Sequence, residues 1–400
     1  MKILHTSDWH LGQNFMSKTR RKEHESFLKW LRELIDEENI DVLLVSGDIF
    51  DTGNPPNYAL ELYYNFLKEI SKSSIKSIVI TAGNHDSVSN IEAPKELLKL
   101  LNINVKGTID AEYPGDNLIE VSHNGQIQCY ICAVPFIKER DVRFSIAGES
   151  YEKRNKAYSR GFKKYYNDIC SLAAKKRRDN KVPIIGMGHT FAAGCNTSEG
   201  EREIFIGNLG KITANSFPEE FDYIALGHLH NPQKATDNEL IRYSGSPISL
   251  SFSESSYDKQ IILIDFKDYP DDVEIESKKV PEFQKLLRLK GDKNSVLSSL
   301  KELNDNVWVE VNLINSVPDT AFLEEIREIE KENSFDILAV KKSDMNSYLV
   351  KHGEKDVQTL YDLTPNDVFD KRITNLEDGE KELLKDAFNE VLMRVNHENS

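Results

Sequence analysis

Val42-Leu-Leu-Val-Ser-Gly-Asp-Ile-Phe-Asp51 is an apolar segment that ends in a glycine and two carboxylates. Four consecutive apolar residues, two of them valine, are typical of a strand that is buried on both faces. Gly47 allows the chain to turn sharply after this strand, so that Asp48 can point away from the sheet. A carboxylate in this position predicts an α/β sheet with a site outside the carboxyl ends of its strands.

Four further apolar runs end in side chains that commonly bind metals. These are Ile3-Leu4 before Asp8 and His10, Ile78–Ile80 before Asn84 and His85, Ile184–Met187 before His189, and Tyr223–Leu226 before His228 and His230. Because the carboxyl ends of parallel strands meet at one edge of a sheet, we expect these side chains to converge. A single D-x-H or G-H-x-H motif is a weak signal, but five such strand ends in one chain predict a metal centre.

The donor types in this set indicate which metals would bind. Carboxylate and amide oxygens together with imidazoles suit two borderline divalent ions such as Mn²⁺, Fe²⁺ or Zn²⁺. Two ions about 3.5–4 Å apart can clamp a phosphate and activate a water molecule, and Asp48 is the natural bridging carboxylate. The predicted metal ligands are Asp8, His10, Asp48, Asn84, His189, His228 and His230.

The remaining periodicity predicts a layered α/β domain over residues 1–268, a small α+β domain over 269–350, and a linker with a helical segment over 351–400. Residues 273–345 have the pattern strand, strand, helix, strand, helix, strand. In the first domain, two helices are expected from apolar residues at helical spacing: Phe27, Leu28, Leu31, Leu34 and Ile35, and then Leu60, Tyr63, Phe66, Leu67 and Ile70.

The net charge of −15 is unevenly distributed. Residues 301–400 contain 12 Lys and Arg against 23 Asp and Glu, whereas residues 151–200 contain 11 against 4. A local basic patch matters more to a phosphate backbone than the total charge. The segment 153–181 also contains tyrosines, so it is either a nucleic-acid surface or a solvated helix with a tyrosine-lined inner face.

The sequence contains no apolar run long enough for a membrane span and no signal peptide at Met1, so we expect a soluble, cytoplasmic protein. Cys129 and Cys132 form a C-x-x-C motif on an expected buried strand. Residues three apart on a strand face opposite sides, so we interpret both as core cysteines rather than as a zinc or redox site.

The other histidines are expected to have structural or no special roles. His5 shares a strand face with Ile3 and is expected to be a hydrogen-bonded core residue. We expect His24, His123, His352 and His397 to be exposed, because no metal-type motif surrounds them.

The motif order D-x-H, G-D-x-x-D, G-N-H-D, G-H, G-H-x-H resembles the calcineurin-like metallophosphoesterase superfamily. Within it, four segments are similar to the SbcD family of bacterial nuclease subunits: Met1–Gly12, Gly47–Gly53, Thr81–Asp86 and Tyr243–Pro247. The resemblance implies a calcineurin-like phosphoesterase domain, an α+β capping domain and a helical C-terminal tail.

The resemblance also implies roles for individual residues. Two ions would be held by the sets Asp8, His10, Asp48 and His230, and Asp48, Asn84, His189 and His228. His85 would be the catalytic residue that meets the scissile phosphate or protonates the leaving oxygen, and Asp86 would orient it. Archaeal and eukaryotic counterparts carry a histidine at the position of Asp51, so the role of Asp51 stays open.

For the whole protein, the resemblance implies the nuclease subunit of an ATP-dependent complex. It would cleave DNA as a 3′-to-5′ double-strand exonuclease and a single-strand or hairpin endonuclease, with Mn²⁺ as the expected ion. The partner would be an SbcC-like SMC-type ATPase, and the chain would form a homodimer within a heterotetramer. We expect nucleoid association and roles in DNA recombination, replication and repair.

Two surfaces are candidates for these contacts. The helix face with Tyr63 and Phe66 is a candidate dimer surface, although such a face more often packs on its own sheet. The C-terminal stripe is expected to dock on the coiled coil of the ATPase, or else on its own α+β domain; it comprises Leu384, Phe388, Val391, Leu392 and Val395.

Three other functions compete with the nuclease. A Ser/Thr protein phosphatase would resemble G-D-x-x-D-R-G and G-N-H-E, but here Thr52 follows Asp51 and Asp86 follows His85. A small-molecule phosphodiesterase would not need the additional domain or the tail. A non-catalytic scaffold would be expected to have lost ligands, and none is missing from the motifs.

Overall fold

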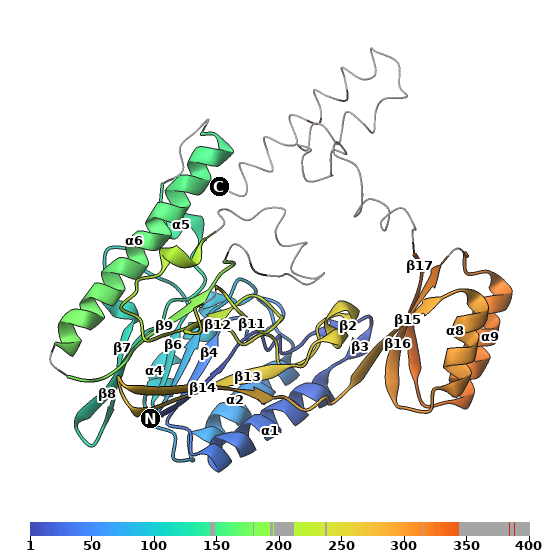
Figure 1. Cartoon of the computed structure of the whole chain (residues 1–400), viewed down its shortest axis with the longest axis horizontal. Helices are drawn as coiled ribbons and strands as arrows, with labels where there is room; N and C mark the ends of the chain where they lie inside the picture. The colour runs from blue at the N-terminus through green and yellow to red at the C-terminus, as the bar shows by residue number, and fades with distance from the viewer. Residues whose placement is uncertain are drawn as a thin grey trace. The chain divides into compact units, whose positions relative to one another are not determined.

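The computed structural model describes residues 1–144, 149–178, 180–192, 195, 212–236, 238–314 and 316–343, together with 384 and 388 (Figure 1). The chain divides into two compact units, Met1–Ser343 and Asp344–Ser400. In the described part of the chain, no helix is both long and apolar enough to cross a membrane.

The first six-stranded sheet has the order β14-β13-β1-β4-β5-β6. Its strands are β1 (Lys2–Thr6), β4 (Val42–Ser46), β5 (Ser77–Thr81), β6 (Ile103–Lys106), β13 (Gln260–Asp268) and β14 (Asp272–Lys279). Strands β1, β4, β5 and β6 are parallel, whereas β13 is antiparallel to both β1 and β14. The parallel strands therefore end at the same edge of the sheet.

The second six-stranded sheet has the order β11-β12-β10-β9-β8-β7. Its strands are β7 (Leu118–His123), β8 (Gln126–Cys132), β9 (Ile184–His189), β10 (Tyr223–Gly227), β11 (Gln233–Lys234) and β12 (Ile241–Tyr243). The central strands β8, β9, β10 and β12 are parallel. All the apolar runs that the sequence analysis assigned to strands are strands in the structure.

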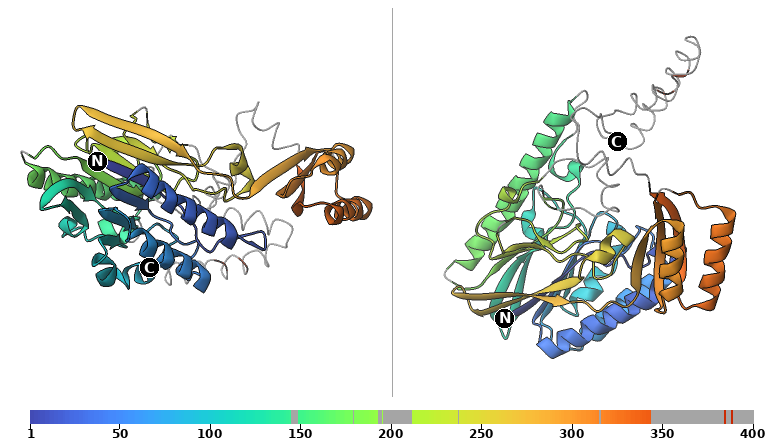
Figure 2. Two further views of the ribbon diagram at one scale, coloured as in Figure 1. Left: turned by 90° about the horizontal axis from the view of Figure 1, so that it is seen from below. Right: turned by 45° about the vertical axis from the view of Figure 1, so that its right-hand side comes forward.

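The two sheets pack face to face, and helices cover their outer faces (Figures 1 and 2). Leu44 and Val79 of the first sheet share an apolar core with Ile131, Met187 and Ala225 of the second. Helices α1 (Arg21–Glu38) and α2 (Asn57–Ile70) pack on the first sheet, and α6 (Tyr151–Arg177) packs on the second. The predicted layered α/β class is confirmed, but the converging strands belong to two sheets and not to one.

Local signals explain where several helices begin and end. Asn39 ends α1 with a left-handed φ of 54°, which asparagine tolerates. The side chain of Ser150 accepts a hydrogen bond from the backbone N–H of Lys153 and caps α6. The shorter helices are α3 (Val88–Glu92), α4 (Lys95–Lys99), α5 (Glu139–Val142) and the 3₁₀ turns η1 (Pro114–Asn117), η2 (Ala214–Ser216) and η3 (Phe252–Ser256).

The cysteine interpretation is confirmed. Cys129 and Cys132 lie on β8, are buried and form no disulfide. Cys129 belongs to the core between the two sheets, whereas Cys132 belongs to the core under α6. The two thiols therefore lie on opposite faces of the strand.

The proposed dimer face on α2 is wrong. Tyr63, Phe66, Leu67 and Ile70 are at most 5% exposed and pack in the core beneath the first sheet. The helix thus buries its apolar stripe against its own domain, as most amphipathic helices do.

The predicted order of elements after residue 272 is confirmed. After β14 come β15 (Lys285–Gly291), α8 (Lys293–Glu302), β16 (Val307–Ile314), α9 (Thr320–Glu332) and β17 (Asp336–Ser343). Strands β15, β16 and β17 form a parallel sheet with both helices packed on it. However, β14 pairs with β13 in the first sheet, so this sheet extends past the expected boundary at Asp268 and ends at Lys279.

A small, mainly aromatic cluster joins the α+β domain to the layered α/β domain. Phe15, from the hairpin of β2 (Asn14–Phe15) and β3 (Lys18–Thr19), stacks on Trp308 of β16 with ring centroids 5.7 Å apart. Phe252 and Leu286 complete the cluster.

Two residues of the C-terminal stripe, Leu384 and Phe388, are helical. The other three residues of the stripe lie outside the described residues, and so do His352 and His397, whose predicted exposure is therefore untested.

Candidate metal centre

The loops after β1, β4 and β5 of the first sheet meet those after β9 and β10 of the second. Asp8, His10 and His230 each offer one ligand atom within 4.8 Å of the others, and Asp48, His189 and His228 form a second such group. All these side chains are buried. The sequence prediction that the strand ends converge is therefore correct.

Asp48 belongs to the second group and also approaches the first. Its Oδ2 atom is 3.2 Å from Nε2 of His189 and 3.6 Å from Nε2 of His10. Its Oδ1 atom accepts a hydrogen bond of 2.9 Å from the backbone N–H of His85. One carboxylate oxygen thus faces imidazoles from both groups, as a bridging ligand requires.

Asn84 belongs to the second group. Its Oδ1 atom lies 3.1 Å from Nε2 of His189 and 3.0 Å from Nδ1 of His228. A neutral amide oxygen adds a donor without adding negative charge to the buried site. Every residue that the sequence predicts as a ligand therefore lies at this junction of the two sheets.

Hydrogen bonds donated by Nδ1 fix the orientation of two of the histidine rings. His189 donates from Nδ1 to the carbonyl oxygen of Ser46 at 2.9 Å. His10 Nδ1 lies 3.2 Å from Oδ1 of Asp51, and donates to this carboxylate. A ring that carries its proton on Nδ1 has its lone pair on Nε2, which is the usual arrangement for a metal-binding histidine. Asp51, whose role the sequence left open, orients His10.

The residues present fit a pair of divalent ions. Nε2 of His10 is buried and has no hydrogen-bond partner among the described residues. An imidazole nitrogen in this situation loses the hydrogen bond it would make to water, and a metal ion compensates for this loss. The mixture of carboxylate, amide and imidazole donors is the one that borderline ions prefer.

The backbone at the site is strained in a way that supports a functional role. Asp8, His10, Asp48 and His228 have φ values of 52°, 46°, 49° and 99°, which place all four in the left-handed region. Residues other than glycine rarely adopt this conformation, and such outliers concentrate at functional sites. A Cβ atom on Gly83 would collide with the Asp48 carboxylate, so only glycine fits there.

The charged side chains at the centre shift one another's pKa values. Burial lowers the pKa of His189, but the neighbouring Asp48 carboxylate outweighs this effect and raises the pKa to about 9. Burial and the charge of His189 lower the pKa of His228 to about 3. Burial alone would raise the pKa of Asp48, but the surrounding imidazoles hold it well below its usual value. The centre is thus a buried anion surrounded by imidazoles.

His85 lies at the half-buried rim of the centre. Its Nδ1 donates a hydrogen bond of 2.8 Å to the carbonyl oxygen of Asp51, which leaves the lone pair on Nε2. The expectation that Asp86 orients His85 is wrong. The Asp86 carboxylate instead accepts backbone hydrogen bonds from Ile49, Phe50 and Gly83 and ties together the loops after β4 and β5.

The predictions for the other histidines have mixed outcomes. His5 is fully buried, and its Nδ1 lies 3.0 Å from the hydroxyl of Tyr223, as expected for a core histidine. His123 is exposed, as expected. The prediction for His24 is wrong, because this residue of α1 is 0% exposed. His24 lies three and four residues before Phe27 and Leu28, so it continues the buried stripe of α1 toward the start of the helix.

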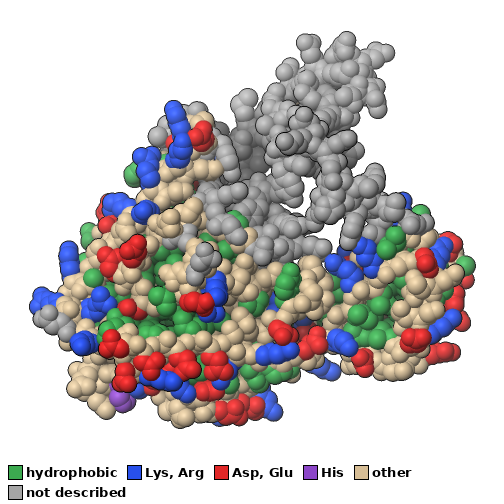
Figure 3. Space-filling view, viewed as in Figure 1, with side chains coloured by type: hydrophobic (Ala, Val, Ile, Leu, Met, Phe, Trp, Pro, Cys, Tyr) green, Lys and Arg blue, Asp and Glu red, His purple; other side chains and the backbone are tan. Residues whose placement is uncertain are grey.

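The basic segment forms α6, and Lys and Arg side chains gather along it (Figure 3). Tyr158, Tyr165 and Tyr166 are at most 6% exposed and belong to the core under the helix. They are therefore not available for stacking on bases. Of the two interpretations, the helix with a tyrosine-lined inner face is correct for these residues.

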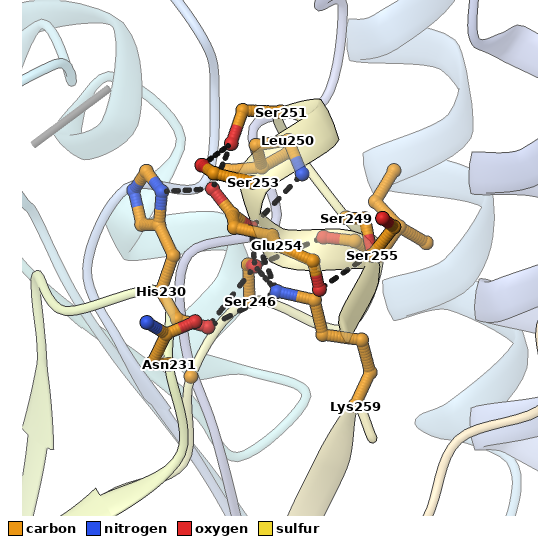
Figure 4. A network of polar contacts seen from close by, with 12 residues as sticks. His230, Asn231, Ser246, Ser249, Leu250, Ser251, Ser253, Glu254, Ser255 and Lys259 are labelled. Carbon is orange, nitrogen blue, oxygen red and sulfur yellow. Dashed lines mark hydrogen bonds and ion pairs between the residues drawn. The ribbon is translucent and has the colours of Figure 1, made fainter. Parts of the chain in front are cut away.

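The sequence analysis also missed Glu254, whose Oε1 atom lies 3.2 Å from Nδ1 of His230 (Figure 4). No known motif marks this residue, which lies in a serine-rich segment. Its contact with His230 depends on how η3 folds back over the loop after β10.

Fold and site together define a metallophosphoesterase of the calcineurin-like class. The family model described as calcineurin-like phosphoesterase matches residues 1–232. A second model, described as the type 5 capsule protein repressor C-terminal domain, matches residues 282–376.

Relatives narrow this class. The D subunit of the nuclease SbcCD from Escherichia coli K12 is 33% identical over 98% of both chains. The protein of the same name from Bacillus subtilis 168 is 31% identical over 83% of both chains. A dimetal phosphatase from Danio rerio, a solved structure, is 12% identical with a TM-score of 0.41, and the match covers 70% of this chain and 96% of the phosphatase. The chain belongs to the SbcD family of calcineurin-like phosphoesterases.

Proposed function

We propose that this protein is the nuclease component of an SbcCD-type complex and hydrolyses phosphodiester bonds of DNA. The observation that carries the proposal is the position of Asp48 between two groups of imidazole and carboxylate donors. The relative from Escherichia coli, which is named a nuclease and aligns along nearly the whole chain, supports a nucleic acid as the substrate.

In this proposal Asp8, His10, Asp48 and His230 hold one ion, and Asp48, Asn84, His189 and His228 hold the other. A bound pair of divalent ions supplies Lewis-acid stabilisation of the phosphate and a more acidic water molecule. Mn²⁺ is the ion we propose.

His85 acts on the substrate and not on the ions. Nδ1 of His85 donates to the carbonyl oxygen of Asp51, so Nε2 is the atom that faces the substrate. To act as a general acid the ring must carry protons on both nitrogens, and the proton on Nε2 then passes to the leaving oxygen. Asp51 supports this arrangement twice, because its carboxylate also orients His10.

The finer activities follow from the family. We propose 3′-to-5′ double-strand exonuclease and single-strand or hairpin endonuclease activity, made ATP-dependent by an SbcC-like SMC-type ATPase. The complex would act in DNA recombination, replication and repair, in the cytoplasm at the nucleoid. The names of the relatives, which refer to an SbcCD nuclease, support the SbcC partner.

We also propose a homodimer within the heterotetramer, through a surface other than the buried face of α2. Leu97 and Leu100 are 70% and 81% exposed, and Leu101 beside them is 46% exposed. Neighbouring exposed leucines at one helix are costly in water and are typical of a protein contact.

Metal analysis and cleavage of a labelled DNA duplex, with and without the ATPase, test the proposal. The wild-type chain should bind two divalent ions, and Asp48→Ala should lose both metal and cleavage. His85→Ala should keep both ions yet cleave about 100-fold more slowly or worse, as loss of a general acid predicts. His123→Ala, at an exposed position, is the matched control.

Two outcomes would contradict the proposal. A single tight zinc ion in the wild-type chain, with cleavage unaffected by Asp48→Ala, would exclude the two-metal assignment. Loss of metal in His85→Ala would make His85 a ligand and would remove its catalytic role.

A further inference from the structure

Glu254 is a fully buried carboxylate at the edge of the metal centre. It lies in η3, and its Oε1 atom is 3.2 Å from Nδ1 of His230 (Figure 4). A carboxylate can only accept at this contact, so Nδ1 of His230 carries the proton and Nε2 carries the lone pair. This is the tautomer that a metal ligand bound through Nε2 requires.

Lys259 holds this carboxylate in place. Its Nζ atom lies 2.7 Å from Oε2 of Glu254, and the residue is itself buried at 7% exposure. The same ammonium group donates to the carbonyl oxygen of His230 at 3.1 Å and to Oγ of Ser246 at 2.9 Å. Lys259 thus binds both the backbone of His230 and the carboxylate that holds its ring.

Further hydrogen bonds leave Glu254 little freedom to move. Its carboxylate accepts from the backbone N–H of Leu250 at 3.0 Å and from the hydroxyls of Ser246 at 3.3 Å and Ser251 at 3.2 Å. A carboxylate with several donors around it has a fixed direction. The ring of His230 is therefore held by a rigid acceptor.

The segment Tyr243-Ser-Gly-Ser-Pro247, which carries part of the family resemblance, surrounds the same histidine. Gly245 has φ of 77°, and a Cβ atom there would lie 2.7 Å from the carbonyl oxygen of His230. Oγ of Ser244 lies 2.9 Å from Oγ of Ser7, which in turn donates to Asp8. The segment thus connects to both Asp8 and His230.

Stability alone does not account for a buried ion pair at this position. The cost of removing two charges from water often exceeds their attraction, and apolar residues of similar size are commonly as stabilising. What an apolar pair cannot do is accept the Nδ1 proton of His230. The geometry therefore favours a role in positioning this ring.

We propose that Glu254, held by Lys259, is a positioning residue that fixes the tautomer and orientation of His230 and so sets the affinity of the ion held by Asp8, His10 and His230. The inference rests on the proposed two-metal function. It predicts a selective effect, because the hydrogen bonds of Glu254 within the described residues reach His230 but not His189 or His228.

The test compares Mn²⁺ binding by the full-length wild-type chain and by Glu254→Gln, using calorimetry and electron paramagnetic resonance. Loss of the acceptor that orients a metal-binding histidine typically weakens metal binding by about 10–100-fold. We expect this loss for one of two ions only, with the spectrum of a coupled pair replaced by that of an isolated ion. A merely structural role would instead lower the melting temperature of the metal-free protein and weaken both ions.

Glu310→Gln is the matched control. Glu310 is another buried glutamate, 1% exposed, and Lys341 lies 2.7 Å from it in the α+β domain. Its variant should bind both ions as the wild type does. If Glu254→Gln does not fold, Glu254→Asp keeps the charge beside Lys259 but withdraws the carboxylate from His230, and should show the same selective loss.

A folded Glu254 variant that binds both ions with wild-type affinity would overturn the inference. So would failure of both Glu254 variants to fold while Glu310→Gln folds, because Glu254 would then be needed for the fold. A wild-type chain that binds fewer than two ions would instead contradict the proposed function, so the two failures are distinguishable.

Discussion

Single buried residues control how this protein responds to acid. His24 and His5 lie in the apolar interior, and burial lowers the pKa of each to about 3. Both are neutral in the folded protein at neutral pH. In the unfolded chain they regain the ordinary pKa of about 6.5.

The replacement His24→Leu should therefore make the protein less sensitive to acid. Between pH 6.5 and 3 the unfolded chain binds a proton at this position that the folded chain does not, so the free energy of unfolding falls as the pH falls. The stability is complete above about pH 6.5 and declines by up to about 1.4 kcal/mol per pH unit below it.

Urea unfolding at about pH 7.5 and about pH 5 measures this effect. The variant should lose about 2 kcal/mol less than the wild type between the two pH values. His123→Leu, at an exposed position, should follow the wild type. Equal losses in His24→Leu and the wild type would show that His24 is protonated without unfolding.

At the scale of elements, the same amphipathic pattern has different outcomes in different helices. The apolar stripe of α2 packs on the first sheet, and the tyrosines of α6 pack on the second. The leucines Leu97, Leu100 and Leu101, in and after α4, remain exposed. Apolar residues at helical spacing predict that one face of a helix is covered, but they do not predict which part of this chain or of a partner covers it.

Replacing Leu97 and Leu100 by glutamate should convert the proposed dimer into a monomer. Two charges in the centre of an apolar contact would have to be buried without partners, which is strongly unfavourable. Light scattering measures the mass in solution. Val317→Glu, at an apolar residue that is 60% exposed in the α+β domain, is the control and should keep the wild-type mass. A dimeric Leu97→Glu/Leu100→Glu variant would exclude this surface.

At the scale of the whole molecule, the metal centre and the α+β domain are connected through η3. Phe252 of this turn packs in the aromatic cluster with Phe15 and Trp308, and Glu254 of the same turn contacts His230. Residues 344–400 form a compact unit of their own. Catalysis and partner binding are thus expected to reside in different parts of the chain.

Deletion of residues 360–400 should leave metal-dependent nuclease activity intact but abolish co-purification with the ATPase. The ligands proposed for both ions lie at or before His230, and the apolar stripe of the deleted segment would gain stability by packing on a partner. Pull-down and cleavage assays on the same preparation measure both properties. Unchanged complex formation would show that the ATPase binds elsewhere.

The sequence alone indicated the strands that precede the site, their order along the chain and the polar residues that follow them. Each of these depends on short-range signals, such as the apolar run before Asp48 or the alternation of apolar and polar residues in β16. Such signals can be recognised from the local sequence alone. The convergence of Asp8 and Asn84 also followed, because parallel strands of one sheet end at a common edge, whereas His230 follows a strand of the second sheet.

The tertiary structure alone decided how these pieces meet. The separation of the strands into two sheets and the contacts of Asp51 and Glu254 with their histidines depend on segments that are not adjacent in sequence. Glu254 reaches His230 only because η3 packs over the end of β10, and no local pattern encodes this approach. The positions of the proposed ligands could be predicted from the sequence. The residues that orient them could not, because orientation depends on packing.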